Sequence, residues 1–441
     1  GAGITIYAPA IVLSTVMGWR LDLTIICSGL VVILYTVTGG SEAVNLTQKY
    51  QIGVIFAGML AAFGVLLARL PSGLSFGDAL TVAGGFGKLN AVDFSTDVHR
   101  RYTFWSGLIG GLFLQLAYFG TDQSQVQRYL SGSSLRESRL GLMFHAVCKI
   151  PMQFFILLLG VLVFVFYQFE RPPVFFNRIA WEREVALHDG DGRLRGLERE
   201  FETAQAEKEQ AVRRWIAARH GGGAAAEQAA RKVAVAANDR SEALRARTKT
   251  ALAAADPSLE TKDSDYVFVT FILNYLPHGL IGLLVAVFFA AAMSSKAGEL
   301  NALGSTTIVD LYRHVIRREA SDAHYVKASK WFTAFWGLVA IAFALFAKIS
   351  ENLIEAGNIV GSVFYGVPLA LFLVAFFLKW IGGTAVFWAA LVTQALVFIF
   401  YFSLSISYLW YNLIGCVICV ALSVVFQVAA GGGRRTDPAA A

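Results

Sequence analysis

Charged residues are scarce in this chain of 441 residues. Only 15% of its residues are Asp, Glu, Lys or Arg, whereas soluble domains average about 25%. Hydrophobic residues make up 56%, and a soluble core of this size could not hide so much apolar side chain from water. The composition therefore predicts an all-α protein that crosses a membrane many times, because helices satisfy their own backbone polar groups in lipid.

Catalytic and cofactor-binding signatures are also missing. The sequence has no H-E-x-x-H, G-x-S-x-G or paired C-x-x-C motif. Its single C-x-x-C pair, Cys416 and Cys419, lies in an apolar run without further ligands, so we expect these thiols to pack. The net charge of +6 comes from Lys and Arg between apolar runs and in one polar segment, not from a phosphate-binding stripe. We therefore expect no enzyme, no organic cofactor and no nucleic-acid partner.

About ten apolar segments are long enough to cross a bilayer, which needs about 20 residues per helix. Lys and Arg, which mark the cytoplasmic side, gather after the fourth, sixth and last segments, as in Arg136, Arg317 and Arg434. If the spans alternate, both chain ends are cytoplasmic, and we expect a multi-pass protein of a bacterial inner membrane. The segments cover residues 2–18, 22–38, 52–70, 103–120, 141–168, 272–295, 330–348, 357–379, 383–402 and 406–428.

Residues 170–265 break this pattern because they are polar and rich in Ala, Glu and Arg. Spacings of three and four residues indicate a helical seam, formed by Leu194, Leu197, Phe201, Ala204, Lys208, Ala211, Trp215 and Ala218. Gly221–Gly223 then interrupts the pattern, which predicts an antiparallel helical hairpin on the periplasmic face. Two roles of this insertion remain open: a spacer without chemistry, or a surface that binds a periplasmic protein partner. The expected units are membrane helices at 1–169 and 266–428, the insertion at 170–265 and a flexible cytoplasmic tail at 429–441.

The first polar interruption of an apolar span follows the fourth segment. It runs from Tyr118 through Asp122 and Gln123 to Gln127, and Gly120 precedes the carboxylate. Polar residues inside a membrane are costly enough to indicate a functional site, and a local break would expose backbone groups to a solute. The alternative is a helix that simply ends at the cytoplasmic interface.

The second polar group closes the sixth segment, with Ala291, Ser294 and Ser295. Two hydroxyls and a carbonyl one turn earlier supply hard, neutral oxygens, the ligands that an alkali cation prefers. The alternative is a small-residue packing face whose serines bond their own helix. Lys296 follows at once, about 60° around the helix from Glu299, so we expect it to pair with Glu299 or to reach the cytoplasmic surface.

These motifs resemble those of the sodium/solute symporter family. Asp122-Gln123 through Gln127-Arg128-Tyr129-Leu130 is similar to one family signature, and Met293-Ser294-Ser295 through Asp310-Leu311-Tyr312 is similar to another. Gly39-Gly40 with Ala43-Val44 is similar to a glycine-pair loop of the family. The resemblance extends over nearly the whole chain outside the insertion.

The resemblance implies a LeuT-like bundle of inverted repeats with a mid-membrane site that works by alternating access. By position, the Ala291 carbonyl and the Ser294 and Ser295 hydroxyls would bind Na⁺ as the coupling ion. Asp122 and Gln123 would face the solute at the broken helix, together with Tyr118 and Gln127. Asn358 would belong to the other helix that contacts the solute.

The sequence also departs from the family pattern. The first two helices of the first repeat would precede residue 1, so we expect an N-terminally truncated symporter. Gln48 stands where a carboxylate is common, and Ser124 replaces the aromatic residue on which sugar-transporting members can stack a pyranose. We expect Na⁺-coupled symport of a small polar organic solute of the sugar, polyol or carboxylate class. A transporter-like receptor or scaffold that presents the hairpin to a partner, or an inactive fragment, is the alternative.

Overall fold

Helices form all the regular structure in the part of the chain that the computed structural model describes. Ten of these helical segments are apolar enough to be considered as membrane spans: eight are long enough to cross a bilayer, and α1 and α5 are shorter. The all-helical membrane fold expected from the composition is therefore confirmed. The described residues are 2–39, 42–90, 92–130, 132, 134–257, 259–346 and 353–430.

Each of the ten segments overlaps a span that the sequence predicts. Large apolar side chains point outward on them, as in Phe154, Phe377 and Phe402, which are 71%, 76% and 80% exposed. Such exposure suits lipid rather than water. The segments are α1 (Ala2–Met17), α2 (Leu21–Gly39), α3 (Glu42–Ala68), the π-helix η1 (Ser106–Gly110) with α5 (Gly111–Thr121), α7 (Leu135–Phe169), α12 (His278–Thr306) with the π-helix η3 (Thr307–Ile316), α13 (Asp322–Phe346), α14 (Leu353–Phe377), α15 (Gly383–Ser403) and α16 (Trp410–Ala429).

The sixth span differs from its predicted range, residues 272–295. A short helix, α11 (Val267–Tyr275), ends before Pro277, and α12 begins at His278 and continues to Thr306. Proline lacks a backbone N–H and so cannot continue α11, but its fixed φ angle is compatible with the start of a new helix. Lys296 and Glu299 lie inside α12, so hydropathy places the end of the span too early. Ser294 and Ser295 therefore lie within a helix rather than at its end.

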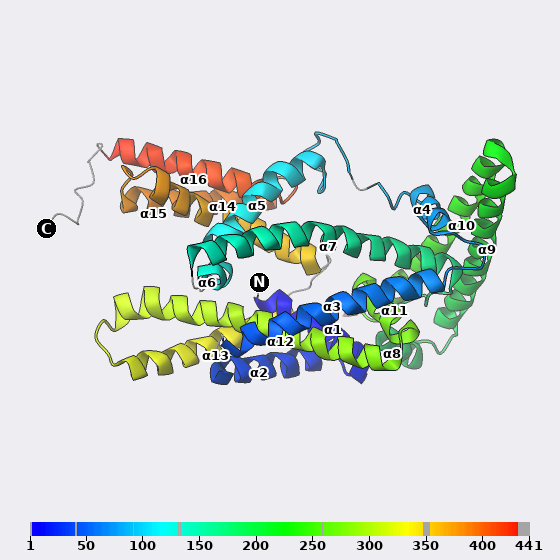
Figure 1. The fold of residues 1–441 in the computed structure, drawn as a ribbon, viewed down its shortest axis with the longest axis horizontal. Coiled ribbons are helices and arrows are strands. Elements are labelled where there is room, and N and C mark those ends of the chain that lie inside the picture. The colour runs from blue at the N-terminus through cyan, green and yellow to red at the C-terminus, as the bar shows by residue number, and fades with distance from the viewer. Residues whose placement is uncertain are drawn as a thin grey trace.

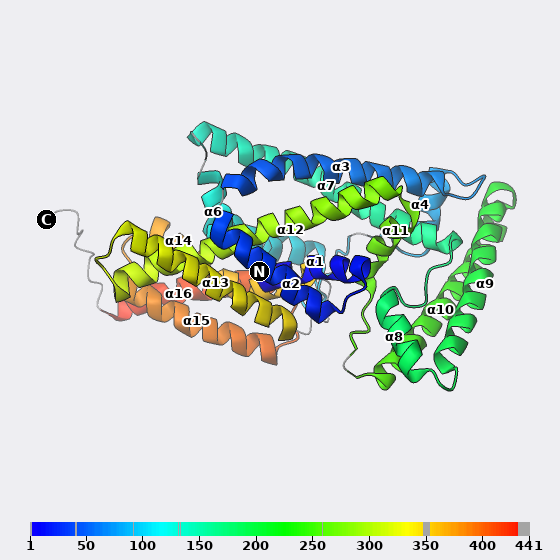
Figure 2. The same ribbon diagram turned by 90° about the horizontal axis from the view of Figure 1, so that it is seen from below.

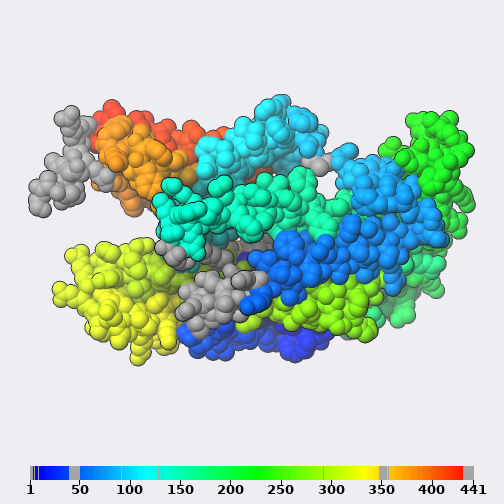
Figure 3. Space-filling view, in the orientation of Figure 1, coloured from blue at the N-terminus to red at the C-terminus, as the bar shows by residue number. Residues whose placement is uncertain are grey.

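The membrane helices form two layers (Figures 1 and 2). The first layer contains α1, α2, α3, α12 and α13, and the second contains α5, α14, α15 and α16, while α7 packs against α3 and α6. Contacts between the layers include α1 with α14, and α12 with the short helix α6 (Gln123–Leu130) that follows α5. In the space-filling view a groove separates the two layers on the side where α6 lies (Figure 3). The polar residues of α5, α6 and α12 therefore meet where the layers approach each other.

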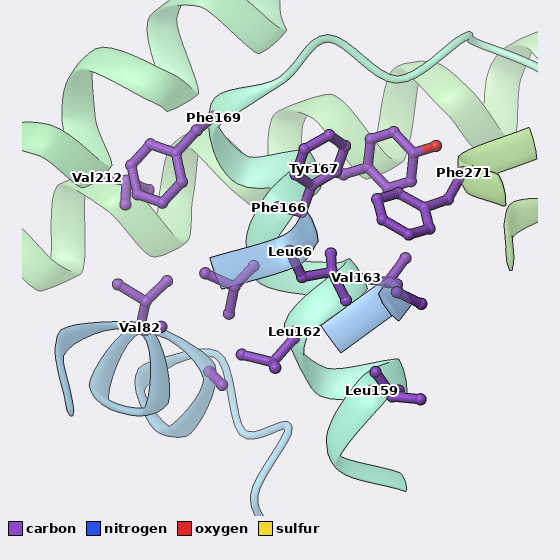
Figure 4. Packing of buried hydrophobic residues seen from close by; sticks show 14 of the residues in the cluster. Leu66, Val82, Leu159, Leu162, Val163, Phe166, Tyr167, Phe169, Val212 and Phe271 are labelled. Atoms are coloured by element: carbon purple, nitrogen blue, oxygen red, sulfur yellow. The ribbon is translucent and has the colours of Figure 1, made fainter. Parts of the chain in front are cut away.

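One hydrophobic core joins the membrane helices to the insertion (Figure 4). The last turns of α7 bury Leu162 and Phe166 among side chains from α3, α11, the short helix α4 (Phe76–Gly85) and α9. Phe271 of α11 packs edge-on against Phe166, with ring centroids 5.2 Å apart. The insertion is thus continuous with the packing of the membrane part.

The insertion consists of α8 (Arg178–His188), α9 (Arg193–Gly221) and α10 (Gly223–Ala255). Helices α9 and α10 pack side by side as a hairpin that lies across one end of the bundle (Figures 1 and 2). Gly223 adopts a φ of 73° at the turn, a conformation that glycine adopts without strain. The seam residues Leu194, Leu197, Phe201, Ala204, Lys208, Ala211 and Trp215 are buried.

Polar contacts also hold the hairpin to α4. Asp78 and Ser75 form a reciprocal capping box at the start of α4, and His220 Nε2 lies 2.9 Å from Asp78 Oδ1. Burial alone would raise the pKa of Asp78, but its hydrogen bonds with Ser75 and His220 outweigh this effect and lower the pKa to about 2. Arg231 of α10 donates to the Gly85 carbonyl at 3.0 Å. The C-terminal end of α9 and the start of α10 are therefore both fixed to α4.

Candidate functional site

The fourth span is broken at Asp122. Helix α5 ends at Thr121, Asp122 has extended backbone angles (φ −75°, ψ 114°), and α6 begins at Gln123. The Ser124 N–H donates to Asp122 Oδ1 at 2.9 Å, so the carboxylate caps the new helix. The break expected from the sequence is present, and Asp122 stabilises it.

Tyr365 of α14 connects the break to a second helix. Its hydroxyl donates to Asp122 Oδ2 at 3.1 Å, while the Ser124 hydroxyl donates to Oδ1 at 2.7 Å. Tyr365 also lies within electrostatic range of Tyr118 and Glu299. It is not among the residues predicted from the sequence, although it follows Asn358 by seven residues and so shares a face of α14 with it.

Gln127 connects the other side of the break to α12. Its Nε2 atom donates to the Gly298 carbonyl at 3.4 Å, which joins α6 to the helix that carries the serine pair. The side chain of Gln123 is exposed. The predicted solute-site residues Tyr118, Asp122 and Gln127 thus lie where the two layers meet.

The predicted Na⁺ ligands lie on one side of α12. Ala291 and Ser295 line a cavity of about 550 Å³ between α1, α3, α11 and α12, and Ser294 is buried with 2% exposure. Thr5 of α1 lines the same cavity and donates to Glu299 Oε2 at 3.3 Å. Neutral hydroxyl and carbonyl oxygens fit an alkali cation. Thr5 is a further hydroxyl that the motifs do not identify, and its only sequence signal is a polar residue in an apolar helix.

Lys296 does not extend to the surface, one of the two expectations for it. Its side chain is only 1% exposed and borders an apolar cavity of about 360 Å³ with Leu13 of α1 and Val32 of α2. The Glu299 carboxylate lies within electrostatic range of the ammonium group. The burial follows from α12 continuing beyond residue 295, because the lysine then lies between packed helices.

Asn358 lies apart from Asp122. It precedes Tyr365, the partner of Asp122, by seven residues of α14, and seven residues span about 10 Å along a helix. Its side chain hydrogen-bonds with the Tyr408 hydroxyl, which lies 3.1 Å from the Tyr102 hydroxyl. Nearby, Arg101 and the buried Glu355 form an ion pair at 2.9 Å. Asn358 therefore belongs to a polar cluster that fixes the start of α14 to the segment before α5.

Two predicted features are not described fully. Gly40 lies outside the described residues, as do the side chains of Ala43, Val44 and Gln48. Most of the predicted C-terminal tail, residues 431–441, also lies outside them.

A membrane bundle whose polar site lies at an interrupted helix has a feature of LeuT-like secondary-transporter folds. A model of the sodium:solute symporter family matches residues 3–175 and 248–393. The chain belongs to this family, which is one of transporters. The match omits residues 176–247, which lie within the insertion.

Individual relatives support the family assignment. The chain is 33% identical to the human sodium/iodide cotransporter over 180 residues, 40% of this chain and 27% of that protein. It is 25% identical to the mouse sodium-coupled monocarboxylate transporter 2 over 482 residues, 99% of this chain and 64% of that protein. The chain thus spans less than two thirds of the length of these curated relatives.

A solved structure confirms the fold class. The substrate-bound, outward-open state of a Na⁺-coupled sialic acid symporter superposes with a TM-score of 0.65 at 19% identity. The superposition covers 97% of this chain and 71% of that chain.

Proposed function

We propose that this protein is a secondary active transporter that couples the movement of a small polar organic solute to Na⁺. The observation that carries the proposal is the contact between the broken helix α5–α6 and α12, made by Gln127 and the Gly298 carbonyl. It places a polar helix break beside the helix with the candidate Na⁺ ligands. The names of the relatives, which include iodide and monocarboxylate transporters, support Na⁺ coupling and leave the solute open.

In this proposal Na⁺ binds the Ala291 carbonyl and the Ser294 and Ser295 hydroxyls. The solute binds beside Tyr118, Asp122, Gln123 and Gln127, and Asn358 lines its path at the start of α14. Coupling requires that Na⁺ bind one conformation more tightly than the other, because equal affinity would shift no population. Since α6 contacts α12, a cation bound on α12 can stabilise one arrangement of the broken helix.

The test is uptake into proteoliposomes with and without a Na⁺ gradient. The double substitution Ser294→Ala and Ser295→Ala removes two ligand oxygens. We expect Na⁺-driven uptake to fall at least about tenfold, because one polar contact with a charged group is worth about that much. Ser305→Ala is the matched control. It removes a hydroxyl from the same helix, but this hydroxyl bonds the helix's own backbone at the Ala302 carbonyl and is not a proposed Na⁺ ligand. Unchanged Na⁺ dependence in the double variant would contradict the assignment of the ion site.

We further propose that the insertion at 170–265 lies on the periplasmic face of a bacterial inner membrane, and that the tail at 429–441 is cytoplasmic. The gap in the family match at 176–247 supports a separate unit there. The receptor or scaffold alternative would need the hairpin to bind a periplasmic protein. Transport is favoured because the polar contacts between α6 and α12 lie in the membrane part.

A further inference from the structure

We infer that the connection between η3 and α13 forms a binding site for an anionic glycerophospholipid. The site lies at the end of the bundle away from the hairpin (Figure 1), and it is separate from the proposed Na⁺ and solute sites. The inference does not depend on the transport proposal, because a lipid can bind whether or not the protein moves a solute.

Basic side chains gather around this connection. Residues 310–330 carry five Lys or Arg and three Asp or Glu side chains, a net charge of +2 with both histidines neutral. Arg317, Lys327 and Lys330 are exposed, and none of them belongs to an ion pair among the described residues. Basic clusters next to a membrane helix attract the phosphate groups of anionic lipids.

A stripe of aromatic rings runs from this charge along α13. Lys327, Trp331 and Phe335 are spaced by four residues, so they share one face of the helix. Trp331 is 72% exposed and Phe335 is 54% exposed. An indole at a membrane surface prefers the level of the headgroups, and a phenyl ring further along the helix meets the chains. The stripe therefore presents a cation, then an indole, then a phenyl ring, in the order in which a phospholipid presents its headgroup and its chains.

A cavity of about 570 Å³ lies beside the stripe. Lys327, Trp331 and Phe335 line it together with Tyr312 of η3 and His324. The Tyr312 hydroxyl lies 3.0 Å from His324 Nε2, and the two rings stack with centroids 5.9 Å apart, which fixes one wall. Along α13, the polar side chains of this cavity precede the apolar rings. The cavity can therefore hold a phosphate group at one end and an apolar chain at the other.

A lone lysine after α14 offers a comparison. Lys379 is exposed and precedes the exposed Trp380, but it is the only charged side chain between residues 371 and 390. A single exposed charge attracts a counter-charge weakly, because water competes for it. The site at α13 combines several cations with an adjacent apolar cavity. A soluble anion would use only the cations and a neutral lipid only the rings, so the combination indicates an anionic lipid.

The test measures lipid binding to the delipidated protein in detergent by native mass spectrometry. One probe is dioleoyl-phosphatidylglycerol. A second, dioleoyl-phosphatidylcholine, has the same chains without a net charge, and a third, glycerol 3-phosphate, has a phosphate group without chains. We expect phosphatidylglycerol to bind at least about tenfold more tightly than the other two, because a hydrogen bond to a charged group is worth about tenfold or more.

The double substitution Lys327→Gln and Lys330→Gln removes two charges at exposed positions, so the fold should persist. We expect it to lose most of the preference for phosphatidylglycerol, while its affinity for phosphatidylcholine stays unchanged. Trp331→Ala should weaken the binding of both lipids alike, because the indole contacts the part that they share. Lys379→Gln is the matched control and should keep the preference.

Equal binding of the two lipids would overturn the inference, and so would a preference that survives the double substitution. If Lys379→Gln lowered the preference as much as the double substitution does, the attraction would belong to surface charge in general and not to this site. Glycerol 3-phosphate bound as tightly as phosphatidylglycerol would identify a soluble anion as the ligand, which also contradicts the proposal. Failure of the transport proposal looks different, because none of these measurements depends on Na⁺.

Discussion

Lys208 shows at the residue scale how a buried charge affects stability. It lies in the seam of the hairpin, only 2% exposed, and burial lowers its pKa from 10.5 to about 8 although Glu242 opposes the change. Between these two pH values the unfolded chain holds a proton that the folded chain has released, so stability rises with pH through this window. Below it, the buried ammonium costs about 3 kcal/mol.

Replacing this lysine should therefore stabilise the hairpin. We expect Lys208→Met to raise the urea midpoint for tryptic cleavage within 193–255 at pH 7, and the advantage over the wild type to shrink at pH 9.5. Lys232→Met, at an exposed position of α10, is the matched control and should change little at either pH. An equal gain at both pH values would show that the charge is not the cause.

At the same scale, the site is only partly readable from the sequence. Asp122 and the serine pair stand out because polar residues in an apolar run are few, and a motif identifies them. Tyr365 and Thr5 come from α14 and α1, far from those motifs. A single polar atom in an apolar helix is a weak signal, and only packing shows that these two contact Asp122 and Glu299. The spacing of residues along one helix does not reveal which residues of other helices contact it.

At the element scale, the hairpin depends on one glycine of α4. A Cβ atom at Gly85 would overlap the indole of Trp215, whose ring packs edge-on against Phe86 with centroids 6.0 Å apart. We expect Gly85→Ala to displace this ring and to destabilise the contact by about 1–3 kcal/mol, the usual cost of overpacking. The measurement is faster hydrogen exchange in the second half of α9.

Gly196→Ala is the matched control for this substitution. Gly196 lies in α9 with open space around the added methyl group, so alanine there should leave exchange unchanged or slow it. Unchanged exchange in Gly85→Ala would mean that the indole moves aside without cost.

Helix positions are more predictable than helix ends. The ten apolar segments follow from hydrophobic runs, which lipid imposes on any helix that it surrounds. The range of α12 does not, because Lys296 and Glu299 resemble the end of a span when hydropathy alone is considered. Burial between α1, α2 and α12 makes these charges tolerable, and such burial is a tertiary property.

At the scale of the whole molecule, the two ends of the bundle should face different compartments. In a background without the four native cysteines, we expect Ala224→Cys at the hairpin tip to react with a membrane-impermeant maleimide in intact cells. Arg318→Cys, in the loop between η3 and α13, should react only after permeabilisation. Both positions are exposed, so accessibility within the fold does not decide the result. Equal labelling of both in intact cells would contradict the topology.

The hairpin across the end of the bundle has a practical consequence for imaging. Small membrane proteins are hard to align in electron micrographs when a detergent belt hides every recognisable feature. Helix α9 alone has 29 residues and is about 43 Å long, and its shared core with α3, α4 and α7 holds it to the membrane helices. The protein therefore carries its own fiducial mark, with Gly222 and Gly223 at its tip as a place to attach a larger one.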